Sequence, residues 1–129
     1  MGRIPEAEDL QIMADPAAYY RATGGDTFLA QIDNKTVGAV AVKGLGADGH
    51  EFCKLIVGEK ARGLGAGRAL VQQCLDFSTA KGGPALYLQS FRALDLALDM
   101  YRRMGFRDAS PPPQLIVLAR TEVIMSKAT

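Results

Sequence analysis

Near the middle of the chain, three glycines at every second position are flanked by two arginines, a pattern suited to binding a diphosphate. The stretch reads Arg-Gly-Leu-Gly-Ala-Gly-Arg over residues 62–68. Because glycine has no side chain, a phosphate group can approach the backbone closely, and each arginine adds a full positive charge beside it. The pattern predicts that an anion is held by Arg62, Gly63, Leu64, Gly65, Ala66, Gly67 and Arg68.

Other interpretations of this loop stay open from its residues alone. The glycines also suit a plain bend between a strand and a helix with both arginines solvated, since short glycine patterns match by chance. A P-loop would end in Gly-Lys-Ser/Thr, but Gly67 is followed by Arg68 and Ala69. The dinucleotide fingerprint also fits poorly, because neither its glycine spacing nor its acidic residue about 20 positions further on is met. A loop of the ATP or NAD type is therefore disfavoured.

The elements around this loop are expected to set it between a strand and a helix. Residues 51–57 are rich in β-forming side chains and end at Gly58. The amides at the start of a helix are unpaired and the helix dipole is positive there, so an anion docks well. Residues 85–89 predict a second strand, parallel to the first because the helix between them makes a right-handed crossover. The core face of that helix is expected to carry Leu70, Val71, Cys74, Leu75 and Ser78, and Gly82, Gly83 and Pro84 end it.

The rest of the chain predicts a mixed arrangement of strands and helices. Two short helices are expected before Gly24, over residues 5–13 and from Asp15, which can cap the second one. Residues 27–32 and 36–42 predict a hairpin, and a glycine-rich loop over 44–49 leads into an antiparallel meander. Residues 95–104 predict a helix that ends at Gly105, with Leu94, Ala97, Leu98, Tyr101 and Met104 on one side. Of two late apolar runs, 115–119 and 123–125, the second is expected to be a strand.

Composition limits the classes of function. The chain has 129 residues, 48% of them hydrophobic, which suits one domain over 1–129 with a continuous core. The formal net charge of +1 gives no global attraction to nucleic acid or to an anionic membrane. No stretch approaches about 18 apolar residues and no signal-peptide core opens the chain, so the expected location is the cytoplasm. Cys53 and Cys74 are expected to be buried reduced thiols.

Two segments resemble the GNAT superfamily of N-acetyltransferases. Residues 57–70 (VGEKARGLGAGRAL) are similar to its acetyl-CoA-binding segment, Arg/Gln-x-x-Gly-x-Gly/Ala after a strand that ends in Val. Residues 97–106 (ALDMYRRMGF) are similar to the family helix end Ala-x-x-x-Tyr-x-x-x-Gly-Phe. The resemblance runs from Phe28 to Met125. Within it, residues 50–57 are similar to the fourth strand of a bacterial subgroup. The chain departs from the family where Leu94 replaces an Asn. The resemblance implies an α/β (α+β) fold with a mixed, mostly antiparallel, twisted sheet that splays between the fourth and fifth family strands, and with helices on both faces.

The resemblance also implies an activity and its participants. It implies direct transfer of an acetyl group from acetyl-CoA to a small-molecule or peptide amine, without a metal, nucleic acid or membrane partner. The main chain of Leu55, Ile56 and Val57 would lie along the pantetheine arm of the cofactor, almost as an extra strand. A homodimer through the terminal strands is a further option that the resemblance suggests.

Catalytic candidates follow from what acetyl transfer requires. An alkylamine is mostly cationic at pH 7, and deprotonating it costs about 4.6 kcal/mol, so a base is useful. The resemblance implies Glu51 as this base and Tyr101 as the donor to the departing thiolate. Plainer roles are an ion pair of Glu51 with Lys54, and a core position for Tyr101. His50 is a weaker second base and is more often solvated at such a place, while covalent catalysis by Cys53 has no histidine to support it.

Two functions of other classes remain alternatives. A sensor or interaction module would bind acetyl-CoA but release no CoA with any amine. An ordinary nucleotide-binding regulatory domain would let ATP or NAD compete at the loop, and the two matched segments disfavour it.

Overall fold

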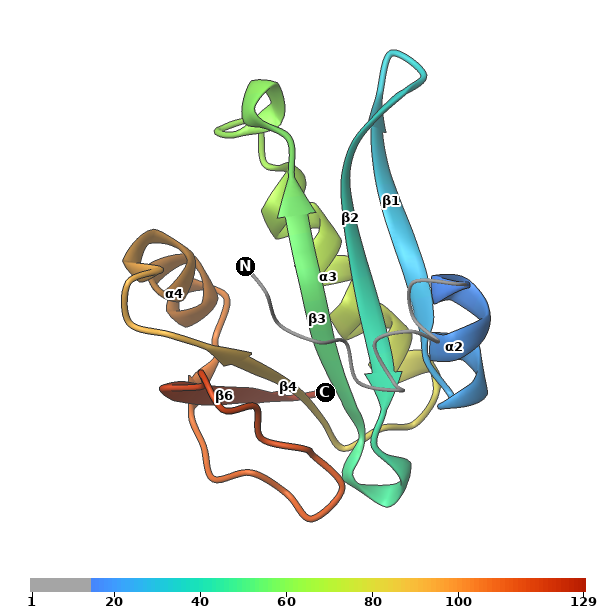
Figure 1. The fold of residues 1–129 in the computed structure, drawn as a ribbon, viewed down its shortest axis with the longest axis vertical. Coiled ribbons are helices and arrows are strands. Elements are labelled where there is room, and N and C mark those ends of the chain that lie inside the picture. The colour runs from blue at the N-terminus through green and yellow to red at the C-terminus, as the bar shows by residue number, and fades with distance from the viewer. Residues whose placement is uncertain (1–14) are drawn as a thin grey trace.

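A computed structural model describes residues 15–129. Six strands form one mixed sheet in the order β1-β2-β3-β4-β6-β5, and neighbouring strands are antiparallel except for β3 and β4. The expected mixed, mostly antiparallel sheet is therefore confirmed (Figure 1). The elements are α2 (Pro16–Ala22), β1 (Asp26–Ile32), β2 (Lys35–Gly44), the 3-10 turn η1 (Gly46–Asp48), β3 (His50–Val57), the 3-10 turn η2 (Glu59–Ala61), α3 (Ala66–Ala80), β4 (Ala85–Ser90), α4 (Asp95–Arg103), β5 (Arg107–Asp108) and β6 (Val123–Ala128).

The hairpin and the capped helix before it form as their residues predict. The side chain of Asp15 accepts a hydrogen bond from the Ala18 amide at 3.1 Å and so caps α2. Asp33 and Asn34 both have positive φ, 50° and 65°, which is the backbone of a tight hairpin turn of the primed type. The helix expected over residues 5–13 lies outside the described residues.

Strands β3 and β4 meet at one end and then separate, which opens the middle of the sheet. Their parallel pairing is limited to His50 with Leu86 and Glu51 with Tyr87. Beyond these pairs the two strands diverge, and the gap between them is visible in Figure 1. The splay expected between the two strands is therefore present.

Strand β3 also contains a bulge. Its pairing with β2 changes register between Ala39 and Ala41, which lie opposite Ile56 and Cys53 respectively. Lys54, inside this interval, has a left-handed φ of 54°. One extra residue on β3 therefore interrupts the regular ladder at this place.

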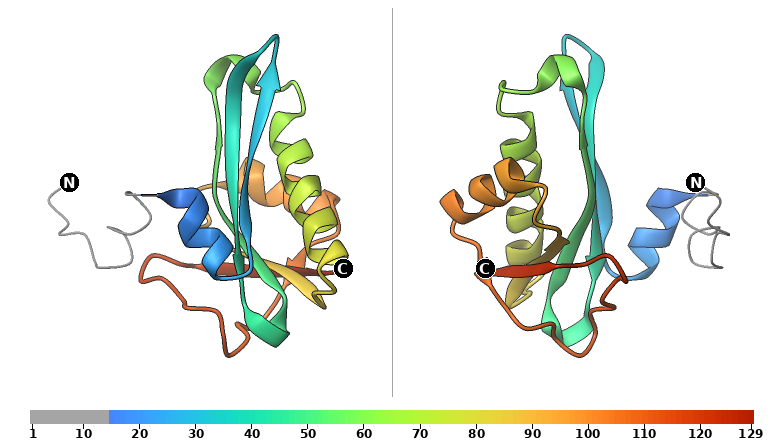
Figure 2. Two further views of the ribbon diagram at one scale, coloured as in Figure 1. Left: turned by 90° about the vertical axis from the view of Figure 1, so that its right-hand side faces the viewer. Right: turned by 60° about the vertical axis from the view of Figure 1, so that its left-hand side comes forward.

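Helices cover both faces of the sheet. Figure 2 shows α2 on one face and both α3 and α4 on the other, as expected. The core forms under α3 and α4, where every residue expected on the inner face of α3 is buried. On α4, Leu98 and Tyr101 are buried, and Met104 is buried directly after it, but Leu94 is 45% exposed. The inward orientation predicted for Leu94 is wrong because this residue precedes the helix and has a non-helical backbone, with ψ of 50°.

The C-terminal part adds β6, which pairs with β4 and with β5, and the short edge strand β5. The strand expected at residues 123–125 is confirmed and extends to Ala128, where β6 ends. The two-residue strand β5 was not expected from the sequence, and it pairs with β6 through Arg107 and Asp108. The other apolar run, residues 115–119, belongs to the loop before β6. Within residues 15–129, no helix has the length and apolar character needed to cross a membrane.

Candidate functional site

The glycine loop forms an exposed turn between β3 and α3. Ala61 is buried and anchors the turn, while residues 62–65 are exposed. Gly63 and Gly65 have φ of 81° and 82°, a conformation that other residues rarely adopt. A Cβ atom added at either position would meet nothing within 4 Å. These two glycines are therefore required by the backbone conformation, and the space beside them is open.

The first turn of α3 is available to an anion. Gly65 occupies the N-cap position and supplies no side-chain hydrogen bond. The amides of the first turn consequently lack a side-chain cap as well as intrahelical partners. Arg68, within this turn, and Arg62, in the preceding loop, are both exposed. The structure thus brings together the dipole, the open amides and the two cations predicted for this loop.

Gly67 differs from the other two glycines of the loop. It lies inside α3, and an added Cβ would lie 3.6 Å from Cγ2 of Val57 and 3.9 Å from Cε of Met100. Both distances are ordinary van der Waals contacts. Gly67 therefore faces the space where the end of β3 and helix α4 approach α3.

In the part of the chain that the structure describes, the edge of β3 that faces the gap has no strand partner beyond Glu51. The Gly58 amide donates to the Val37 carbonyl at 2.7 Å, toward β2. Because backbone groups alternate along an extended strand, Ile56 also turns its amide toward β2, and Leu55 and Val57 turn theirs toward the gap. The side chain of Ile56 is 65% exposed. Of the three residues predicted to line the pantetheine arm, Leu55 and Val57 thus offer main-chain groups and Ile56 offers an apolar side chain.

Glu51 lies at the point where the gap begins. The residue is only 6% exposed, and it belongs to the last pair between β3 and β4. Its Oε2 accepts a hydrogen bond of 2.9 Å from Nε2 of Gln89. Among the residues that the structure describes, the ion pair suggested between Glu51 and Lys54 is not formed, and the Lys54 side chain is exposed.

Tyr101 is buried in an aromatic cluster on the opposite side of the sheet from α2. Its ring packs edge to face against Phe52 at 5.5 Å and Phe106 at 6.1 Å. Burial raises the pKa of Tyr101 above its ordinary value of 10, so the hydroxyl keeps its proton at neutral pH. Within residues 15–129 this hydroxyl has no hydrogen-bond partner. Tyr101 is thus a core aromatic whose hydroxyl keeps its proton at neutral pH.

His50 is a structural residue and is not solvated. Its side chain is buried, with Nδ1 2.7 Å from Oγ of Ser78 and its ring 5.4 Å from that of Phe77. Burial lowers the pKa of His50 and outweighs a backbone hydrogen bond to Gly24 that raises it. Because neighbouring residues of a strand point to opposite faces, His50 contacts α3 whereas Glu51 faces the other way. The solvated position expected for His50 is therefore wrong, and this histidine faces away from Glu51.

Both cysteines are free thiols, as expected, and neither suits nucleophilic catalysis. Cys53 lies in β3 and Cys74 on the inner face of α3. Burial raises the pKa of Cys53 to about 11 and that of Cys74 to about 12. A thiol with such a pKa is almost fully protonated at neutral pH and is a weak nucleophile.

Gln89, on β4, is a site residue that the sequence analysis missed. Its side chain is hydrogen-bonded both to Glu51 and to the loop before β6. The alternation along β4 could have identified it, because Leu86 and Leu88 are buried on one face and Gln89 belongs to the other.

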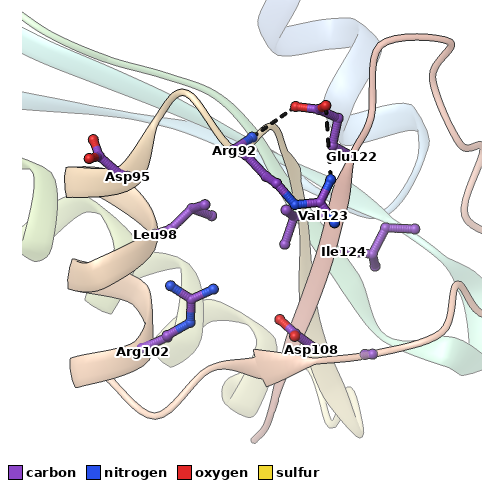
Figure 3. A pocket seen from close by; sticks show the side chains of 9 residues that line it. Arg92, Asp95, Leu98, Arg102, Asp108, Glu122, Val123 and Ile124 are labelled. Carbon is purple, nitrogen blue, oxygen red and sulfur yellow. Dashed lines mark hydrogen bonds and ion pairs between the residues drawn. The ribbon is translucent and has the colours of Figure 1, made fainter.

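A separate polar pocket of about 460 Å³ lies between α4 and the strands β5 and β6. Figure 3 shows Arg92 beside Glu122, and Arg102 on the wall formed by α4. The Arg92 amide donates to Glu122 Oε1 at 2.9 Å, and the two side chains approach to 3.9 Å. None of the predicted site residues lines this pocket, so it is distinct from the glycine loop and from Glu51.

Comparison with known proteins identifies the family. The model of the Acetyltransferase (GNAT) family matches residues 3–106. An uncharacterized N-acetyltransferase of Schizosaccharomyces pombe is 30% identical over 101 residues, which cover 77% of this chain and 62% of that protein. The chain thus spans less than two thirds of that relative's length.

Solved structures give the same fold. An acetyltransferase of the GNAT family from Staphylococcus aureus Mu50 superposes with a TM-score of 0.84 at 19% identity, over 96% of this chain and 80% of that one. A GNAT family acetyltransferase from Elizabethkingia anophelis, solved with acetyl-CoA bound, superposes with a TM-score of 0.72 at 19% identity, over 100% and 94% of the two chains. With most of its length matched by the family model, and with both resembling segments inside that match, this chain belongs to the GNAT family of acetyltransferases.

Proposed function

We propose that this protein transfers an acetyl group from acetyl-CoA to a small-molecule or peptide amine by direct attack within a ternary complex. The observation that carries the proposal is the uncapped start of α3, which lies beside the gap between β3 and β4. A structural neighbour that binds acetyl-CoA with the same fold supports this choice of cosubstrate.

The cofactor would be held by two groups of residues. Its diphosphate is expected at the open amides of residues 66–68, with Arg62 and Arg68 adding charge. Its pantetheine arm is expected along the unpaired edge of β3, where Leu55 and Val57 turn their main-chain groups to the gap. This mode uses the backbone of β3 as a docking strand, so the thioester would end near Glu51.

The reaction needs three events at that place. Glu51 accepts a proton from the ammonium form of the acceptor, and the neutral amine forms a bond to the thioester carbon. A backbone amide on the open edge of β3 stabilises the resulting oxyanion. The carbon–sulfur bond then breaks, the acetyl group stays on the amine, and Tyr101 donates a proton to the leaving thiolate. The nitrogen of the new amide loses its second proton, which returns to the Tyr101 oxygen through solvent, and Glu51 releases its proton to solvent. The products are the acetylated amine and CoA.

Gly67 gives the sharpest test of cofactor binding. Substitution of Gly65 would strain a left-handed backbone, whereas Gly67 has no such restriction and faces the space beside β3 and α4. Gly67→Glu introduces a carboxylate near the expected diphosphate, in the first turn of a helix, where acidic residues favour folding. Gly67→Gln has nearly the same shape without the charge and is the matched control.

The measurement is acetyl-CoA binding by calorimetry, followed by an assay of thiol release with a panel of amines. We expect the parent to bind, Gly67→Glu to bind at least about tenfold more weakly than Gly67→Gln, and some amine to give thiol release. A folded parent that does not bind acetyl-CoA would refute the proposal. Binding without thiol release for any amine would instead identify the sensor alternative.

We further propose that the protein works in the cytoplasm. Both cysteines are free, which suits a reducing compartment such as the cytoplasm. A homodimer through the terminal strands stays a prediction, which light scattering would test.

A further inference from the structure

The carboxamide of Gln89 uses its full hydrogen-bonding capacity. Its Nε2 donates to Oε2 of Glu51 at 2.9 Å and to the carbonyl oxygen of Ile116 at 2.8 Å. Its Oε1 accepts from the amide of Leu118 at 3.0 Å and from the hydroxyl of Thr121 at 2.6 Å. A side-chain amide has two N–H donors and two acceptor positions, so all four are occupied.

Two backbone groups fix which way this amide faces. A carbonyl such as that of Ile116 only accepts, and an amide such as that of Leu118 only donates. The nitrogen of Gln89 must therefore face the carbonyl of Ile116, and its oxygen must face the amide of Leu118. As a consequence, the second N–H of Gln89 points at Glu51. A flipped amide would turn its oxygen toward the carboxylate and would lose three of the four hydrogen bonds.

The position of Gln89 in the sheet explains why it reaches Glu51. Tyr87 pairs with Glu51 across the two strands, and Gln89 is the next residue of β4 on the same face. Because β3 and β4 separate beyond this pair, no further backbone hydrogen bond between the strands holds the site together. The side chain of Gln89 spans the start of the gap.

Among the described residues, ionisable groups near Glu51 come from β2, β3 and β4. Lys43 lies opposite it on β2, Cys53 lies two residues further along β3, and Tyr87 lies beside it on β4. None of these is altered by a change at Gln89, so such a change isolates the contribution of the amide.

We propose that Gln89 is a positioning residue for the transfer reaction, which orients the carboxylate of Glu51 at the mouth of the gap and is itself oriented by the loop of residues 116–121. This inference rests on the proposed role of Glu51 as the base. The donated hydrogen bond favours the ionised form of Glu51, which is the form that can accept a proton. The loop therefore contributes to catalysis without touching the reacting atoms.

Three variants separate this role from a purely structural one. Gln89→Met keeps the length of the side chain and removes every hydrogen bond. Gln89→Glu keeps the shape but replaces the donor with a second carboxylate. Thr121→Val removes one hydrogen bond from the far side of the amide and leaves the Leu118 and Ile116 contacts that set its orientation, so it is the matched control.

The first measurement is a pH profile of thiol release from acetyl-CoA, using the amine of the panel that reacts fastest. In Gln89→Met the acidic limb should move to higher pH, because the ionised carboxylate loses a donor, and kcat/KM at neutral pH should fall about tenfold. In Gln89→Glu the move should be larger because of the added negative charge. Thr121→Val should keep the parent profile, and KM for acetyl-CoA should stay unchanged in all three. A profile that does not move in either Gln89 variant would overturn the proposal, whatever the loss in rate.

The second measurement does not depend on turnover. Carbon-13 NMR of the glutamate carboxyl groups, with Glu51→Gln to assign the signal, follows protonation of Glu51 directly. Protonation should occur at higher pH in Gln89→Met than in the parent. If the parent gave no thiol release, the proposed function would fail while this titration still decided whether Gln89 controls Glu51. An unchanged titration in both Gln89 variants, judged folded by circular dichroism, would refute the link.

Discussion

Glu51 and Tyr87 form the last pair between β3 and β4 before the two strands separate. A buried carboxylate therefore lies where the backbone pairing of the two strands ends. The site consequently depends on the divergence of two strands and on few side chains.

Replacing the proposed base should slow transfer but spare cofactor binding. Glu51→Gln keeps the side-chain size and removes the group that accepts a proton. Loss of a general base typically costs about 100-fold or more in rate, so kcat/KM at pH 7 should fall by at least this amount. Steady-state kinetics gives the rate, and calorimetry should give an acetyl-CoA affinity within about threefold of the parent. A variant with full activity would exclude Glu51 as the base.

Removing the hydroxyl of Tyr101 should affect chemistry more than stability. Tyr101→Phe retains the ring contacts with Phe52 and Phe106 and deletes the proposed proton donor. We expect kcat to fall about tenfold to 100-fold, with a thermal midpoint close to that of the parent. Because burial raises the pKa of this tyrosine, the parent should also show no alkaline loss of activity from Tyr101 up to pH 9. An unchanged kcat would leave Tyr101 with its packing role alone.

His50 should make the stability of the fold depend on pH in the range just below neutral. Its pKa is lowered in the folded state, so between the folded value and the ordinary value of 6.5 the unfolded chain binds more protons. The free energy of unfolding that depends on neutral His50 is fully present above pH 6.5, and it is lost as the pH falls from 6.5 through the lowered pKa of the folded state. Urea unfolding at pH 7.5 and 5.5 should give a lower midpoint at pH 5.5.

The matching control is His50→Gln, which cannot titrate. This variant should start from a lower stability because the contact with Ser78 changes. Its midpoint should nevertheless vary less between pH 7.5 and 5.5 than that of the parent. Equal pH dependence in the two proteins would assign the effect to other groups.

The thiol of Cys53 should be dispensable for transfer. Its raised pKa of about 11 leaves very little thiolate at pH 7. Cys53→Ala should therefore keep kcat within about threefold, and the folded parent should react slowly with a thiol reagent until urea is added. A loss as large as that expected for Glu51→Gln would instead indicate covalent catalysis.

Local patterns in the sequence predicted much of the fold. The hairpin follows from Asp33 and Asn34, which accept a left-handed backbone, and α3 follows from its apolar spacing and from the glycines that bound it. Such features need only neighbouring residues to form. The two-residue strand β5 could not be predicted, because its pairing with β6 arises from the tertiary fold.

Only those parts of the site that are continuous in the sequence could be predicted. The glycine loop is a continuous segment, so its residues could be named from the sequence. The burial of His50 depends on Ser78, 28 residues away, and the link from Gln89 to Thr121 spans 32 residues. Contacts over such separations leave no periodic pattern in one sequence, and they were found only in the structure.

The bulge in β3 divides this strand into two halves of opposite phase. Before the bulge, the even-numbered residue Phe52 faces the core. After the bulge, the odd-numbered residues Leu55 and Val57 pack against the same core. Without the extra residue at Lys54, either Phe52 or the pair Leu55 and Val57 would have to face the other side of the sheet. Deleting Lys54 would therefore exchange the inner and outer surfaces of half a strand, whereas Lys54→Gly would only relieve its left-handed backbone. The length of this strand is thus fixed to the residue, although the identity of residue 54 is open to change.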